Sequence, residues 1–115
     1  MSPLKLSGKN ISVQISSNLS LTVFQGQSQI LWETSETHTP TFLVRRGNAE
    51  PRRLSLADGK ASVSVFDDGT YQGYAVSLSE FEAYDVGMEL IFAIDPTVDE
   101  LMIQAAQVDG ADTVM

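Results

Sequence analysis

The chain has 115 residues and a mass of 12.5 kDa, the size of one domain. Hydrophobic residues make up 43% and charged residues 19%, a composition that supports a buried core and argues against intrinsic disorder. The absence of cysteine excludes disulfides, cysteine-ligated zinc and thiol catalysis. The single histidine, His38, excludes a metal site built from two histidines.

Charge is distributed unevenly. The first 60 residues contain all seven basic residues and four acidic ones, whereas the rest of the chain contains eleven acidic residues and no basic one. The net charge of −8 disfavours nucleic acid, because each neutralised phosphate needs a nearby cation, and disfavours anionic membranes. No apolar run approaches the ~20 residues of a membrane span, and residues 1–9 lack the apolar stretch of a signal peptide. We therefore expect a cytoplasmic protein that binds neither nucleic acid nor membrane, and in which the basic cluster at 45–53 pairs with the acidic half or stays solvated.

Apolar and polar residues alternate with a period of two along most of the chain, which is typical of β-strands with one buried face. Residues 16–18 and Gly47-Asn48 have turn chemistry and separate neighbouring runs. The segment 96–107 also contains helical spacing, so that helix remains an alternative there. The pattern predicts about nine short strands, at 11–15, 19–23, 29–33, 42–44, 54–56, 61–65, 74–78, 88–94 and 101–105.

Two Asp-Gly steps indicate tight turns, because these residues readily adopt positive φ. Asp58-Gly59 predicts a hairpin between strands 54–56 and 61–65, and Asp67-Asp68-Gly69 predicts a second hairpin before strand 74–78. Strands with one apolar face must stack in two layers or close into a barrel. The sequence therefore predicts an all-β fold, an antiparallel β-sandwich of roughly nine short strands.

Sites for catalysis are poorly supported. There is no Gly-x-Ser-x-Gly motif and no glycine-rich phosphate loop, and His38 lies in a polar segment where a solvated side chain is expected. Glycosidase chemistry needs two carboxyl groups facing each other across a cleft, roughly 5–9.5 Å apart, and a sandwich of this size leaves little chain to build one. The acidic clusters lack the spacing of a calcium loop, so we predict no catalytic residue, no metal and no cofactor. The clusters considered are Glu80 with Glu82, Asp95 with Asp99 and Glu100, Asp67 with Asp68, and Asp109 with Asp112.

Three aromatic residues are candidates for carbohydrate contact, because an aromatic face can stack on a sugar ring. Tyr71 and Tyr84 flank turns and are the better surface candidates, whereas the single tryptophan, Trp32, is more typical of a core anchor between two sheets.

Several stretches together carry a family resemblance. They are the hairpin 10–16 to 19–24, Gly26 followed by Ile30-Leu31-Trp32-Glu33, the run 74–78, and the strand pair 89–95 and 100–107. In this order they resemble the N-terminal galactose-mutarotase-like β-sandwich domain of some bacterial glycoside hydrolases. The catalytic carboxylates of such enzymes lie on a downstream barrel, so no catalytic residue is carried over.

The resemblance implies that 1–115 is a single, non-catalytic accessory domain from a longer carbohydrate-active enzyme, with the catalytic domain of the parent protein as its partner. One alternative is a free-standing interaction module that associates with a second copy of itself, with strand 88–94 or 101–105 at an exposed edge. Another is a small carbohydrate-binding domain. An accessory domain should show an apolar patch where its catalytic domain packs, whereas an independent module should form a closed symmetric oligomer.

Overall fold

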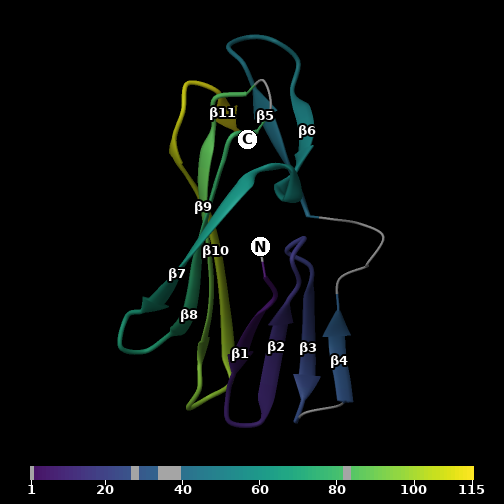
Figure 1. Ribbon diagram of the computed structural model, residues 1–115, viewed down its shortest axis with the longest axis vertical. Coiled ribbons are helices and arrows are strands. Elements are labelled where there is room, and N and C mark those ends of the chain that lie inside the picture. Colours follow the sequence, from purple (N-terminus) through teal and green to yellow (C-terminus); the bar gives the residue numbers. More distant parts are fainter. Residues whose placement is uncertain (1, 27–28, 34–39, 82–83) are drawn as a thin grey trace.

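A computed structural model describes residues 2–26, 29–33, 40–81 and 84–115. The fold is all-β, and its antiparallel strands form three sheets arranged as a sandwich (Figure 1). The N-terminal sheet has the spatial order β1 (Leu4–Ser7), β2 (Ile11–Ile15), β3 (Leu21–Gln25) and β4 (Gln29–Glu33). The long sheet has the order β10 (Glu100–Asp109), β9 (Gly87–Asp95), β8 (Gln72–Ser79) and β7 (Lys60–Asp67). The small sheet has the order β11 (Thr113–Val114), β5 (Thr41–Arg45) and β6 (Arg52–Ser55).

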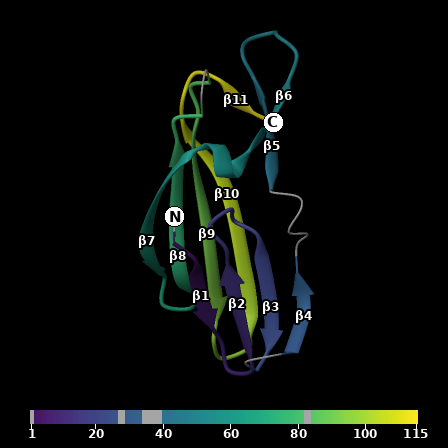
Figure 2. The same cartoon turned by 45° about the vertical axis from the view of Figure 1, so that its right-hand side comes forward.

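The N-terminal sheet lies against the long sheet, with β1 nearest to β9 (Figure 2). The alternation of apolar and polar residues gives each sheet one apolar face, because residues directly opposite each other on antiparallel strands share a face. In the long sheet the register places Val76 beside Leu90 and aligns Tyr74 with Phe92 on the face that is buried. The N-terminal sheet contributes the other half of the core, and its fully or almost fully buried side chains are Leu6, Val13, Ile15, Leu19 and Leu21.

The small sheet lies at the opposite end of the molecule from the N-terminal sheet (Figure 1). Its strand β5 contributes Phe42, whose ring meets that of Phe81 edge-on with centroids 5.1 Å apart. Phe81 is 1% exposed and belongs to the main hydrophobic cluster, so the small sheet is attached to the same core as the two larger sheets.

The antiparallel sandwich is confirmed, but eleven strands are described where about nine were expected. The two additional strands, β1 and β11, have the shortest alternating patterns in the sequence. β1 alternates only Leu4 and Leu6 with polar residues, and β11 contains two residues. The helical alternative for 96–107 is wrong over most of that segment, because β10 pairs along its length with β9.

The predicted hairpin at Asp58-Gly59 is wrong. Residues Leu56–Asp58 form a short 3-10 helix, η1, and Gly59 has a φ of −83°, so the positive φ of a tight turn is absent. Strand β6 pairs with β5 and strand β7 pairs with β8, which makes this segment a crossover between two sheets. Burial explains the outcome, because Leu56 is 8% exposed and a Cβ at Gly59 would lie 2.5 Å from the Phe81 ring.

The other turn predictions are confirmed, with one boundary shifted. The second Asp-Gly turn joins β7 to β8, where the Asp67 carboxylate accepts a hydrogen bond from the Gly69 N–H. The turn at 16–18 extends to Ser20, because the Asn18 side chain accepts the Ser20 N–H at 3.1 Å and Leu19 takes a φ of 69°. Strand β3 therefore begins at Leu21, two residues later than expected.

Candidate functional site

The core face of the long sheet is covered in its centre and exposed at both edges. One row of opposed residues runs across the four strands as Val65, Tyr74, Phe92 and Ile103. Phe92 on β9 is 4% exposed, whereas Ile103 on β10 is 48% exposed and Val65 on β7 is 82% exposed. The N-terminal sheet is thus too narrow to cover the long sheet, and two apolar margins remain: the β7 margin (Val63 and Val65) and the β10 margin (Ile103 and Ala105).

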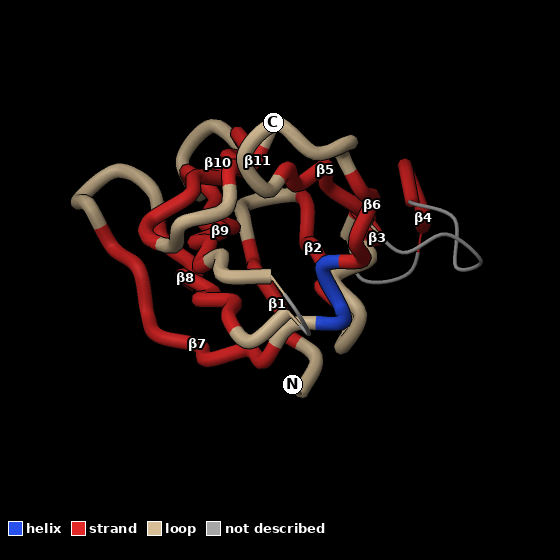
Figure 3. The backbone as a smooth tube through the Cα atoms, turned by 90° about the horizontal axis from the view of Figure 1, so that it is seen from above, coloured by secondary structure: helices blue, strands red, loops and turns tan. Residues whose placement is uncertain are grey.

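The N-terminal sheet has an uncovered margin of its own at β4. This strand lies farthest from the long sheet when the molecule is seen from above (Figure 3). Its three apolar side chains, Ile30, Leu31 and Trp32, are all about half exposed. The register with β3 shifts between Val23 and Phe24, so β4 is an irregular edge strand. The expectation that the single tryptophan anchors the core is wrong, because Trp32 is 53% exposed.

The three carbohydrate candidates lie on different parts of the molecule. Tyr71 is in the β7–β8 turn and Tyr84 precedes β9, at opposite ends of the long sheet, while Trp32 is on β4. The Tyr71 hydroxyl donates a hydrogen bond to Glu100 at 2.6 Å, which, together with burial, raises the pKa of Tyr71. The Tyr84 ring carries the Arg46 guanidinium, centred 5.1 Å from the ring centroid. The fold therefore does not assemble the three rings into one stacking platform, and Trp32 alone presents a large exposed aromatic surface.

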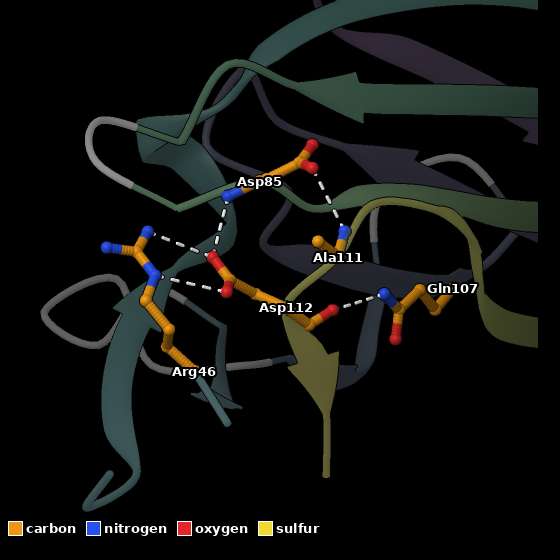
Figure 4. Close-up of polar contacts among 5 residues, drawn as sticks. All are labelled: Arg46, Asp85, Gln107, Ala111 and Asp112. Atoms are coloured by element: carbon orange, nitrogen blue, oxygen red, sulfur yellow. Dashed lines mark hydrogen bonds and ion pairs between the residues drawn. The ribbon is translucent and has the colours of Figure 1, made fainter. Parts of the chain in front are cut away.

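A buried carboxylate joins the small sheet to the long sheet (Figure 4). Asp112 is 4% exposed and receives both Nε and Nη2 of Arg46 at 3.1 Å, together with the backbone N–H of Asp85 at 2.8 Å. These donors favour the charged carboxylate, and the hydrogen bond from Arg46 is the main reason that the pKa of Asp112 lies below its usual range. The interaction confirms that part of the basic cluster pairs with the acidic half of the chain.

Neighbouring side chains and backbone groups add further hydrogen bonds around Asp112. Gln107 on β10 donates from its side-chain amide to the Asp112 carbonyl and accepts the Val114 N–H at 2.9 Å. The Asp85 carboxylate accepts the Ala111 N–H at 3.0 Å. Gly110 has a φ of 106°, and a Cβ there would lie 2.2 Å from the Asp85 carbonyl oxygen, so only glycine fits this turn. We call Arg46, Asp85, Gln107 and Asp112 the C-terminal latch.

Two of the other acidic clusters contribute a carboxylate that accepts backbone N–H groups. Asp99 accepts the N–H groups of Lys9 and Asn10 at 2.6 and 3.0 Å, which ties the β1–β2 turn to the end of β9 and the start of β10. Asp68 accepts the N–H groups of Thr70 and Tyr71, and these bonds lower its pKa. Among the described residues no group of three or more acidic or histidine side chains could hold a metal ion. His38 and Glu82 lie outside the described residues.

Concave surface is shallow in the described part of the chain. One open hollow of about 530 Å³ lies on the outward face of the N-terminal sheet, beside the β1–β2 turn, with Lys5, Lys9 and Gln25 among its lining residues. It contains no carboxylate pair and no aromatic ring, so it lacks the groups for glycosidase chemistry. No helix in the described ranges is both long enough and apolar enough to cross a bilayer.

Comparison with protein families, with curated proteins and with solved structures found no match for this chain. The sequence predicted the strands that carry the uncovered margins, but it did not predict that Val65 and Ile103 are exposed. Both occupy inward positions of strands, and alternation alone predicts that such positions are buried.

Proposed function

We propose that this domain is a non-catalytic accessory domain of a carbohydrate-active enzyme, which works by packing against the catalytic domain. One observation carries the proposal: Ile103 continues the buried row of Phe92 and is nevertheless 48% exposed. An apolar core face that is left open in this way is stabilised when another protein layer removes it from water.

The kind of partner follows from the sequence resemblance to the sandwich domains of glycoside hydrolases. The β10 margin supports packing against a protein layer, because the long uncharged stretch from Leu101 to Val108 offers apolar and amide surface with no charge to desolvate. The C-terminal latch does not involve residues 101–106, because its hydrogen bonds to β10 are made only by the last residues of that strand.

A photocrosslinking amino acid at position 103 tests the proposal in the native host. We expect crosslinks from position 103 to a peptide of a carbohydrate-active catalytic domain, identified by mass spectrometry. Position 104 is the matched control, because Gln104 is exposed on the opposite face of the same strand. Equal crosslinking from the two positions, or crosslinks only to this domain itself, would contradict the proposal.

A second function, carbohydrate binding, is supported by the half-exposed Trp32 alone. Because Trp32 is the single tryptophan, its fluorescence reports directly on this strand. We expect solvent-exposed emission that is readily quenched by iodide. If the ring binds sugar, oligosaccharides should shift the emission and protect it from iodide, and Trp32→Ala should abolish binding measured by calorimetry. Iodide quenching of Trp32 that neither neutral nor acidic oligosaccharides change would contradict carbohydrate binding.

A further inference from the structure

The strand β7 is a long, regular and uncharged edge of the long sheet. It is the longest regular edge of the described sheets besides β10, with eight residues paired to β8 on one side without a register shift. Its interior, from Ala61 to Phe66, contains no charge and no proline. Natural edge strands are usually protected by charge, proline, bulges or shortness, and β7 has none of these devices along its interior.

The other edges of the described sheets are protected against the same contact. β1 contains Lys5, β4 has a register shift, and β11 has two residues. β6 follows Pro51 and begins with Arg52-Arg53. The charged residues of β10 are both acidic, at its two ends, so two copies of β10 in antiparallel pairing would bring like charges together.

From these features we propose that two copies of this domain associate through β7, in an antiparallel pair around a two-fold axis at Ser64, and form one continuous eight-stranded sheet. A two-fold axis perpendicular to the sheet keeps the core faces of both copies on the same side. In this register Val63 lies opposite Val65 of the second copy, twice by symmetry. The pairing covers Val65, which is 82% exposed in the single chain.

Charge selects this register and this occupant. Lys60 begins the strand, Asp67 ends it, and Asp68 follows in the turn to β8. With Ser64 opposite its own copy, Lys60 at each end of the pair lies beside Asp67 and Asp68 of the second copy, so that opposite charges meet at both ends. A register centred on Val63 keeps one valine pair at the axis, but it places Lys60 opposite Phe66 and Val65 opposite Ala61, so it loses the contact between opposite charges. The Lys60 side chain is 77% exposed, and its ion pair with Glu80 at 3.9 Å is solvent-exposed and therefore weak enough to give way to a carboxylate of the second copy.

Sedimentation velocity over a concentration series tests the dimer. We expect the mass to rise with concentration from 12.5 kDa to twice that value for the wild type. Ser64→Lys places two ammonium groups opposite each other at the axis and should raise the dimer dissociation constant at least about tenfold. Ser77→Lys is the matched control, because Ser77 is exposed on the same face one strand inward and should leave the constant unchanged. Circular dichroism of both variants at low concentration checks that they fold.

A cysteine scan tests the register independently, since the chain has no cysteine of its own. Under oxidation Ser64→Cys should form a disulfide-linked dimer, whereas Val63→Cys and Ser77→Cys should remain single chains. A monomer at all concentrations, or a dimer that Ser64→Lys leaves intact, would overturn the proposal. Crosslinking from position 103 uses the opposite edge of the long sheet, so its outcome is separate from these results.

Discussion

At the scale of single residues, the most informative group is the buried carboxylate of Asp112. A carboxylate is retained in such a place only when donors satisfy it, and here a guanidinium fork and a backbone N–H do so. The Arg46 side chain is itself 57% exposed and lies over the Tyr84 ring, so one end of the pair stays hydrated. The latch therefore holds the chain end in one conformation and offers no reactive group.

This pairing predicts a dependence of stability on pH. Because the pKa of Asp112 is lowered in the folded state, its contribution to the free energy of unfolding is complete above the ordinary aspartate pKa of about 3.9 and is lost as pH falls from there through the lowered value. Asp112→Asn should be less stable than wild type at pH 7, and the difference should shrink towards pH 3. Denaturant unfolding at several pH values measures this difference.

The exposed Asp109, three residues away, is the control for the latch. Asp109→Asn should unfold close to the wild type at pH 7, because it removes a charge without removing the bond to Arg46. A difference between wild type and Asp112→Asn that stays constant from pH 7 to pH 3 would show that the carboxylate charge is unimportant for the latch.

At the scale of elements, the short strand β1 has a larger role than its four residues suggest. It lies close to β9 of the opposite layer, and its Leu6 is 3% exposed. A Cβ built on Gly73 of β8 would lie 3.0 Å from the Leu6 side chain, which shows how closely the two layers approach. The covering of the long sheet therefore depends on β1, a strand whose alternating pattern is too short to be predicted from the sequence.

We expect Leu6→Ala to lower the free energy of unfolding by about 2–5 kcal/mol, through lost burial and the cavity that remains. Lys5→Ala changes the adjacent, outward side chain and should stay within about 0.5 kcal/mol of the wild type. Chemical denaturation of the two variants compares them directly. Equal stability of Leu6→Ala and Lys5→Ala would mean that β1 does not cover the core.

At the scale of the whole molecule, the sandwich is flat and elongated. Its dimensions are 47 × 32 × 21 Å and its radius of gyration is 15.2 Å, compared with about 13 Å for a compact domain of similar length. A flat shape follows from layers that overlap only in part, and it leaves apolar rows open at the edges. The β7 and β10 margins, at which we propose association, are the places where the partial overlap of the layers leaves apolar side chains exposed.

Amide hydrogen exchange should reflect this arrangement. We expect the slowest exchange in β8 and β9, which are paired on both sides and carry the buried rows, and faster exchange in the edge strands β4 and β7. Raising the protein concentration should slow exchange in β7 if the dimer forms and leave β4 unchanged, which makes β4 an internal control. Uniform exchange across the long sheet at low concentration would contradict the uneven covering.

The sequence by itself determined the all-β class, the antiparallel alternation, most strand positions and the turn at Asp67–Gly69, because all of these follow from local periodicity and turn chemistry. For the basic cluster it left two alternatives, pairing with the acidic half or solvation. It did not distinguish the crossover at Asp58-Gly59 from a hairpin, because both have the same local sequence and only the packing of Leu56 and Phe81 separates them.

Only the tertiary structure decided which inward positions are covered. Val65, Phe92 and Ile103 occupy equivalent places in the alternation, yet one is buried and two are exposed. Alternation reports which face of a strand is apolar, whereas burial depends on the width and offset of the opposing layer. That offset depends on strands distant in the sequence, and it leaves open the two edges of the long sheet at which we propose association.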